Sequence, residues 1–208
     1  MRQPRIYPII KRSIDIVVAL LALICLSPIY LVIAILIQLE RSTSRIIYAQ
    51  KRVGLHGKVF KIYKFQTMLD DAETRLKADP ELYALFVANG YKLPTNEDPR
   101  ITRLGRILRK TSLDELPQFW NVLNGTMSLI GPRPVVKDEL KEYGDQVDEF
   151  LSVTPGVFGL WQASGRSNIH YPERAQIELE YVKKQSFTFD CYVFLMNIIK
   201  VFEQEGAF

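Results

Sequence analysis

Two adjacent acids, Asp114 and Glu115, lie in the otherwise apolar segment TSLDELPQFW (111–120). A structural explanation is available, because Ser112 followed by Glu115 matches a capping box and acids favour the first turn of a helix. The functional alternative is that the two carboxylates bind a hard, oxygen-preferring cation such as Mg²⁺. The segment alone leaves both interpretations open.

Arginines surround this acidic pair. Four of them recur at every third position before it: Arg100, Arg103, Arg106 and Arg109. On a helix such a row stays broadly on one side, where it forms either a solvated basic face or an anion clamp. Arg133 stands between two prolines, which either aim its guanidinium at an anion or make it part of a turn. Acids and arginines together fit phosphoryl transfer on a diphosphate, with ionised Asp114 as the nucleophile.

The composition of the chain argues against other kinds of catalytic site. The chain has 208 residues and a formal net charge of +4, enough for a domain with a core and an anchor. Cys25 and Cys191 offer no disulfide framework, and His56 and His170 have no metal-ligand spacing. The sequence therefore argues against a zinc site and against a Cys/His nucleophile pair.

One apolar block, residues 16–37, contains no charged residue and is long enough to cross a bilayer. Ser27 and Pro28 interrupt it near its centre, leaving two arms of roughly 15 Å each, half of the hydrocarbon thickness. Both flanks carry the same number of basic residues, so both favour the cytoplasmic side. A re-entrant helix–break–helix and a kinked spanning helix remain alternatives. A homodimer would be one way to satisfy the broken backbone.

The remaining sequence predicts an α+β, mostly helical fold: a re-entrant anchor over residues 1–40 and a cytosolic catalytic domain with interfacial amphipathic helices over 41–208. Short β-rich runs around VGLHG predict a small hairpin. Its strands are expected over 46–50 and 58–65. Helical patterns and breaks predict further elements. These helices are expected over 70–88 with a break near Pro80, and over 101–110, 112–123, 137–151, 173–184 and 187–202.

These features together resemble the bacterial sugar transferase family, the monotopic phosphoglycosyl transferases. The resemblance covers nearly the whole chain and is most specific over 98–134, DPRITRLGRILRKTSLDELPQFWNVLNGTMSLIGPRP. It implies transfer of a sugar-1-phosphate from a UDP-sugar to undecaprenyl phosphate, with release of UMP, at the bacterial inner membrane. It also implies the first membrane step of O-antigen, capsule or exopolysaccharide synthesis. No nucleic-acid partner is expected.

The resemblance also implies roles for individual residues. Asp114 and Glu115 would be the catalytic dyad and hold Mg²⁺, with Asp114 forming a covalent phosphosugar intermediate. The helix break would lie at Ser27 and Pro28. The residues implied to contact phosphate, nucleotide or lipid are Arg109 and Arg133, with Lys64, Gln162 and Arg166 as weaker candidates. Arg12 and Asp15 are either a functional pair at the membrane surface or a simple flank ion pair.

The sequence departs from the family pattern in places. Gln66 replaces an arginine and removes a cation, Ser44-Arg45 replaces a Gly-Pro pair, Phe158 replaces a threonine, and Glu178 replaces an aspartate. The length of 70–97 resembles members that use UDP-galactose or UDP-glucose. The large members of the family carry extra N-terminal spanning helices, and by comparison this sequence is expected to be the catalytic unit alone. The alternative function is a non-catalytic module that binds anionic lipid through its basic face.

Overall fold

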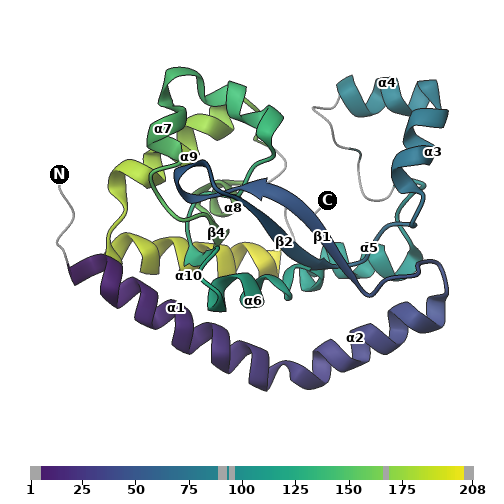
Figure 1. Ribbon diagram of the computed structural model, residues 1–208, viewed down its shortest axis with the longest axis horizontal. Helices are drawn as coiled ribbons and strands as arrows, with labels where there is room; N and C mark the ends of the chain where they lie inside the picture. Colours follow the sequence, from purple (N-terminus) through teal and green to yellow (C-terminus); the bar gives the residue numbers. More distant parts are fainter. Residues whose placement is uncertain (1–5, 89–92, 94–96, 166–168, 204–208) are drawn as a thin grey trace.

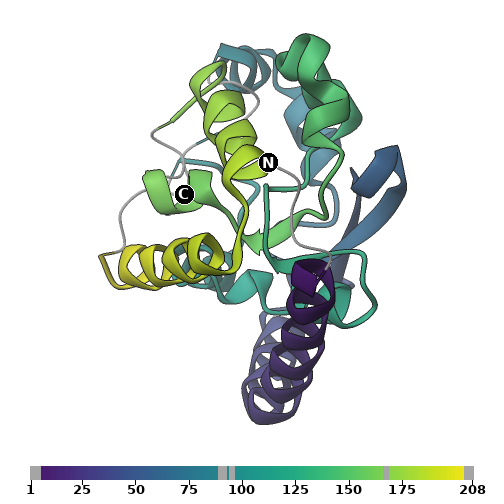
Figure 2. The same cartoon turned by 90° about the vertical axis from the view of Figure 1, so that its left-hand side faces the viewer.

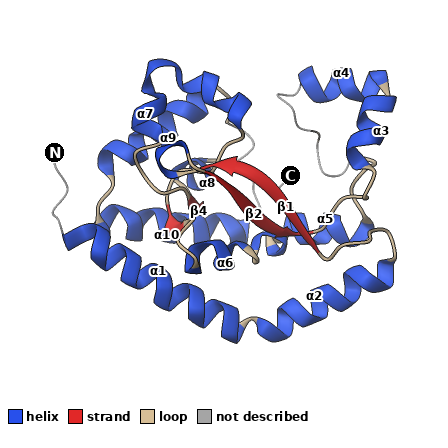
Figure 3. Cartoon of the chain, in the orientation of Figure 1, coloured by secondary structure: helices blue, strands red, loops and turns tan. Residues whose placement is uncertain are grey.

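The computed structural model describes residues 6–88, 93, 97–165 and 169–203, with side chains described up to residue 200. The fold is α+β and mostly helical, as predicted. Helices surround a β-hairpin, and a second, two-stranded sheet lies in the body (Figure 3). Two long N-terminal helices form a shallow V along one side, and the other elements lie above it (Figure 1).

The apolar block folds as two helices, α1 (Ile6–Cys25) and α2 (Ser27–Glu40), bent by 57°. Among the described residues no single helix is long and apolar enough to cross a membrane, although the bent pair passes that test by length and composition. Pro28 has no N–H for the carbonyl four residues back, and Ser27 Oγ donates to that oxygen, Ile24 O, at 2.7 Å. The break therefore falls where the sequence predicts it.

Polar contacts join α1 to the body. Arg12 donates to Val122 O at 2.6 Å and to Leu123 O at 2.8 Å, the C-terminal carbonyls of α6 (Gln118–Leu123). The buried carboxylate of Asp15 accepts from Leu129 N at 2.9 Å. Arg12 and Asp15 thus bind different segments of the body instead of forming a simple flank ion pair.

The outer sides of α1 and α2 are apolar and exposed. Figure 2 shows the two helices projecting from the body. Their buried side chains face the body: Ala19 of α1 lies in the main core, and Ile33 and Ile37 of α2 pack with Phe65 and Leu108. Exposed aliphatic side chains cover the rest, including Ile9, Val17, Leu21, Leu31, Val32 and Leu39. An exposed apolar surface of this extent indicates an interaction with lipid or with another apolar surface.

The predicted hairpin is confirmed as β1 (Ile47–Val53) and β2 (Val59–Phe65), paired antiparallel with Tyr48 opposite Lys64. Because side chains alternate along a strand, Tyr48, Gln50 and Arg52 share one face with Lys64. Asn121 of α6 fixes β2 by accepting from Tyr63 N at 3.0 Å and donating to Lys61 O at 2.7 Å. The position of Lys64 is therefore tied to the helix that follows the acidic pair.

The segment after the hairpin folds as α3 (Ala72–Ala78), α4 (Pro80–Ala88) and α5 (Arg103–Lys110), which confirms the break at Pro80. Between α4 and α5, residues 89–92 and 94–96 lie outside the described residues. Helix α5 begins tightly against the chain after β2, because Thr102 N donates to Thr67 O at 3.0 Å. A Cβ on Gly105 would lie only 2.2 Å from the same oxygen, so this helix start requires glycine.

The second half of the body includes a short parallel sheet that the sequence did not predict, β3 (Ser128–Ile130) with β4 (Gly156–Phe158). Its strands approach so closely that a Cβ on Gly156 would lie 2.1 Å from Gly131 N. The other elements are η3 (Lys137–Gln146), α7 (Val147–Phe150), α8 (Leu160–Ser164), α9 (Glu173–Lys184) and α10 (Phe187–Glu203). The last two confirm the predicted helices.

Two predicted helices are wrong. Residues 137–151 are not one amphipathic α-helix, because Gly144 has a positive φ of 50° that divides a 3₁₀ segment before α7 begins. Residues 112–123 are not one helix either. Ser112 adopts a left-handed conformation (φ 58°), the acidic pair lies in the 3₁₀ turn η2 (Leu113–Glu115), and α6 begins only at Gln118. The predicted capping box is absent, since Ser112 makes no side-chain cap.

Candidate active site

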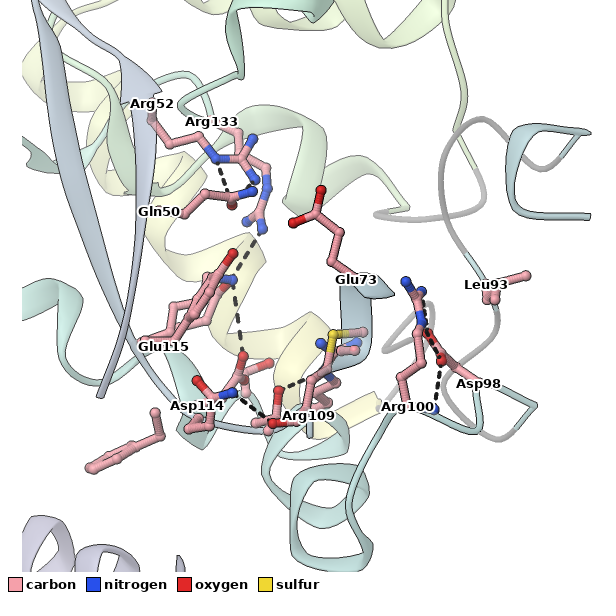
Figure 4. Close-up of a pocket in the computed structure, with 18 of the residues that line it drawn as sticks. Gln50, Arg52, Glu73, Leu93, Asp98, Arg100, Arg109, Asp114, Glu115 and Arg133 are labelled. Atoms are coloured by element: carbon pink, nitrogen blue, oxygen red, sulfur yellow. Dashed lines mark hydrogen bonds and ion pairs between the residues drawn. The ribbon is translucent and has the colours of Figure 1, made fainter. Parts of the chain in front are cut away.

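The acidic pair lies in a cavity of about 1330 Å³ that extends from the hairpin to α3 and α4. The described catalytic and phosphate-binding candidates all line this cavity: Asp114, Glu115, Lys64, Arg109, Arg133 and Gln162. Arg166 lies outside the described residues. Figure 4 shows Arg52 and Arg133 at one end, the acidic pair between, and Arg100 and Asp98 at the other end. The fold therefore gathers residues up to 98 positions apart in sequence, Lys64 to Gln162, around one space.

The Glu115 carboxylate is held by two cations. Its Oε1 accepts from Lys64 Nζ at 2.6 Å and from Arg133 Nη2 at 3.2 Å. Burial acts to raise the pKa of Glu115, but Lys64 and Arg133 outweigh it and hold that pKa well below its usual range. Glu115 is therefore an anion held in place by two cations. These ion pairs explain the acid at this position better than helix capping does.

The Asp114 carboxylate differs from its neighbour. It lies 4.0 Å from Lys64 Nζ, and no hydrogen bond occupies it within the described part of the chain. Burial raises the pKa of Asp114, Lys64 acts to lower it, and the charge on Glu115 raises it further. The arrangement leaves Asp114 with open oxygens in a desolvated, cation-rich cavity, which favours an approaching phosphate or metal ion.

The Asp114 and Glu115 carboxylates fit Mg²⁺ only as part of a ligand set. No group of three or more His, Cys, Asp or Glu side chains that could hold a metal occurs in the described residues. Mg²⁺, however, is commonly bound by one or two carboxylates together with substrate phosphates and water. The open Asp114 oxygens beside an ionised Glu115 match that pattern, so the remaining ligands would come from a phosphate-bearing substrate.

Arg109 is held beside the acidic pair by the chain that follows β2. Its Nε donates to Thr67 Oγ1 at 3.0 Å, and burial lowers the pKa of its guanidinium. The expected arginine row does not act as one face: Arg103 and Arg106 are exposed, whereas Arg100 forms a buried pair with Asp98. Arg100 and Arg109 line the cavity, whereas Arg103 and Arg106 do not.

Arg133 is aimed by the turn between its two prolines and by a buried carboxylate. Its backbone N–H donates to Glu178 Oε1 at 3.1 Å. Glu178 is fully buried, and its Oε2 has no hydrogen-bond partner among the residues described. Burial raises the pKa of Glu178 to about 7. The residue that departs from the family pattern thus supports the arginine that reaches Glu115.

Two other residues singled out in the sequence sit at the cavity wall. Gln162 Nε2 donates to Val157 O at 3.2 Å, and its Oε1 is buried without a hydrogen-bond partner in the described structure. Gln66 Nε2 donates to Met68 O at 2.6 Å. Gln66 therefore stabilises the chain that follows β2. The cavity wall at position 66 carries this neutral amide where the family pattern has an arginine.

Further residues that line the cavity were not predicted from the sequence. Arg52, Glu139 and Arg174 form ion pairs at the end of the cavity that contains Arg133. Strand alternation could have placed Arg52 on the face of Lys64, because the register of the hairpin follows from its turn. Nothing local in the sequence pairs Glu139 with Arg174, since that contact depends on the packing of η3 against α9.

Residues 6–204 match the protein family described as Bacterial sugar transferase. The chain is 43% identical over 203 residues to "Undecaprenyl-phosphate galactose phosphotransferase" of Salmonella typhimurium, covering 96% of this chain and 42% of that protein. It is 40% identical over 202 residues to "Exopolysaccharide production protein ExoY" of Sinorhizobium fredii, covering 95% and 88%. It is 32% identical over 208 residues to "UDP-glucose:undecaprenyl-phosphate glucose-1-phosphate transferase" of Escherichia coli, covering 96% and 42%. The chain thus spans less than half the length of two of these relatives.

The buried Glu178 gives a prediction about stability. Its folded-state pKa of about 7 exceeds the ordinary 4.5, so its neutral form stabilises the fold at low pH. That contribution is lost as pH rises through about 7, and amounts to about 3 kcal/mol at most. Thermal unfolding at pH 5.5 and 8.5 should show Glu178→Gln gaining stability over the wild type at the higher pH. Glu180→Gln, an exposed change on the same helix, should not; equal pH slopes for wild type and Glu178→Gln would contradict the assignment.

Proposed function

The chain belongs to the bacterial sugar transferase family, and from that premise we propose that it transfers a hexose-1-phosphate from a UDP-sugar to undecaprenyl phosphate, releasing UMP. The names of the relatives support this acceptor, and they support UDP-galactose or UDP-glucose as the donor. Exopolysaccharide, capsule or O-antigen synthesis is the corresponding process, of which this transfer would be the first membrane step.

One observation supports the proposal most directly: Asp114 has open carboxylate oxygens, whereas its neighbour Glu115 is fixed by Lys64 and Arg133. A nucleophile needs free lone pairs, and a buried cation cluster needs a fixed anion to hold it together. The two adjacent acids therefore divide these roles. The cavity that contains them is large enough for a nucleotide sugar.

The chemistry that this geometry supports has two steps. An Asp114 oxygen attacks the phosphorus that bears the sugar, a P–O bond forms, and the bond to the bridging oxygen breaks. Its electron pair leaves with UMP. The phosphate of undecaprenyl phosphate then attacks the same phosphorus, and the Asp114 carboxylate leaves. Lys64, Arg109 and Arg133 bind and orient phosphate oxygens during both displacements.

Mg²⁺ is proposed as the cofactor, held by Asp114 and Glu115 together with substrate phosphate oxygens. When bound it would neutralise phosphate charge and favour the ionised form of Asp114. The residues of the chain supply the rest: burial limits the contact of the acidic pair with water, and Lys64 holds Glu115 in place.

A re-entrant anchor is proposed for residues 1–40, with residues 41–208 forming the catalytic part on the cytosolic face of the inner membrane. The bend at Leu26 and the exposed apolar sides of α1 and α2 support it. Tyr30 of α2 donates to Leu116 O at 2.5 Å, one residue beyond the acidic pair. A lipid phosphate entering along α2 would therefore arrive near Asp114.

The function is tested with purified protein, undecaprenyl phosphate, Mg²⁺ and a panel of UDP-sugars. UMP release is expected with UDP-galactose or UDP-glucose, and chelation by EDTA should abolish it until Mg²⁺ is restored. A module that only binds anionic lipid would release no UMP with any donor. The absence of UMP from the whole panel would therefore contradict the proposal.

Asp114→Asn should abolish turnover without loss of folding. The amide lacks the nucleophilic oxygen, and burying a neutral group in this desolvated position costs less than burying a charge. UMP release and thermal unfolding measured together separate these effects. Asp138→Asn, an exposed change on η3, is the matched control and should retain full activity. An Asp114→Asn protein that keeps more than a few per cent of wild-type activity would exclude this residue as the nucleophile.

The start of α1 and the end of α2 should both face the cytosol, because a re-entrant anchor enters and leaves the membrane on the same side. A Gln3→Cys variant lacking Cys25 and Cys191 should react with a membrane-impermeant thiol reagent only after cells are opened, as should a Lys141→Cys control on the exposed surface of η3. Labelling of position 3, but not of position 141, in intact cells would indicate a spanning helix instead.

A further inference from the structure

A cluster of three arginines, one buried and two partly exposed, lies beside the acidic pair, at the end of the cavity formed by β1, η3 and α9. We call it the arginine cluster, and it contains Arg52, Arg133 and Arg174. Glu139 joins two of its members: its Oε1 lies 3.3 Å from Arg52 Nη1, and its Oε2 lies 3.2 Å from Arg174 Nη1. Arg133 connects the cluster to Glu115. The cluster is therefore continuous with the site described above.

In the part of the chain that the structure describes, the three guanidinium groups of the cluster form ion pairs with only two carboxylates, Glu139 and Glu115. Glu139 is one carboxylate between two guanidinium groups, and Glu115 is shared between Arg133 and Lys64. Burial lowers the pKa of Arg52, and the neighbouring charges of Arg133 and Arg174 lower it further, whereas Glu139 raises it. Cations held together in a desolvated cavity favour the binding of an anion, because an anion relieves their mutual repulsion.

The three arginines differ in what they offer to a ligand. Arg174 is buried, with its guanidinium 4.3 Å from the ring centre of Trp161 and 4.8 Å from that of Tyr171. Arg52 and Arg133 are partly exposed to the cavity. Only Nη2 of the Arg133 side chain has a hydrogen-bond acceptor in the described structure, Glu115 Oε1. Arg133 therefore has N–H groups left for a ligand, Arg52 is partly exposed to the same cavity, and Arg174 supports them.

Glu139 and Gln50 fix the direction of Arg52. Gln50 Oε1 accepts from Arg52 Nε at 3.2 Å and from Nη2 at 2.8 Å. Arg52 Nη1 also donates to Pro134 O at 3.3 Å, directly after Arg133. The guanidinium is thus oriented before any ligand arrives, which reduces the entropy cost of binding a phosphate.

The position of the cluster distinguishes between two phosphate sources. The acidic pair is tied to α2 through Leu116 and Tyr30, whereas Arg52 lies beside Arg133, on the far side of Glu115 from Asp114, and contacts η3 (Figure 4). A phosphate that remains attached to membrane lipid would reach the acidic pair first. The distal position therefore favours a phosphate of the water-soluble substrate.

We propose that Arg52 and Arg133 bind the phosphate of the nucleoside diphosphate sugar that leaves as nucleoside monophosphate, and that Glu139 and Arg174 position Arg52. This inference rests on the proposed function. When Asp114 attacks the sugar-bearing phosphorus, the bond to the bridging oxygen breaks and its electron pair passes to the leaving phosphate. Arg52 stabilises the charge that develops there, so its effect belongs to the first displacement and not to the second.

The test separates the two displacements. UMP formed in a single turnover without undecaprenyl phosphate measures the first step, and Arg52→Gln should slow it by about 100-fold, with partial rescue in Arg52→Lys. The same variant, loaded by long incubation and freed of nucleotide, should transfer phosphosugar to undecaprenyl phosphate at the wild-type rate. Lys51→Gln, on the opposite face of β1, is the matched control and should leave both steps unchanged. Glu139→Gln should slow the first step less than Arg52→Gln does.

Binding of UMP, measured by calorimetry, tests the subsite without turnover, and Arg52→Gln should weaken it by about 10-fold at unchanged unfolding temperature. Slowing of the second step alone would assign Arg52 to the lipid phosphate and overturn the inference. Unchanged UMP binding and an unchanged first step would also overturn it. If the wild-type protein binds UMP through Arg52 but releases none from UDP-sugars, the proposed function fails while the subsite stands.

Discussion

The structure depends on one shared carboxylate, that of Glu115, which accepts from Lys64 on the hairpin and from Arg133 in the turn after β3. These contacts bring three separate segments to one point. They also satisfy one of two adjacent acids and leave the other open. An unpaired anion at the position of Glu115 would be costly at this depth, and without an anion the two cations would repel each other. The division of labour between Asp114 and Glu115 follows from this arrangement.

Other contacts of the fold hold the residues around Glu115 in place. Asn121 joins β2 to α6 and so fixes the position of Lys64. Glu178 accepts a hydrogen bond from the backbone of Arg133. The close contact at Gly105 fixes the chain that holds Arg109. The bent N-terminal pair belongs to the same construction. Ala19 of α1 lies in the main core and Tyr30 of α2 contacts the chain next to the acidic pair. A membrane anchor built in this way would place the reaction at the lipid boundary, as a lipid-linked acceptor requires.

Much of the fold followed from local patterns in the sequence. Short β-rich runs around a glycine-bearing turn predicted the hairpin, Pro28 and Pro80 predicted breaks, and periodicity predicted α9 and α10. The predicted helix over the acidic segment is wrong for a physical reason. Its sequence pattern matches a helix cap, but the ion pairs with Lys64 and Arg133 are stronger partners for Glu115 than the backbone amides of a first helical turn. Ser112 then adopts a left-handed conformation that no local rule requires. Likewise, Glu139 meets Arg52 across 87 positions of sequence, and no local pattern encodes that contact.

The most direct test of this account is the covalent state of Asp114. Protein mixed with Mg²⁺ and the accepted UDP-sugar, without lipid, is quenched, digested and examined by mass spectrometry. We expect the mass of a hexose phosphate on the peptide that contains Asp114, and its loss when undecaprenyl phosphate is added before quenching. Formation of the lipid-linked product with no such adduct on Asp114 at any time would contradict the account.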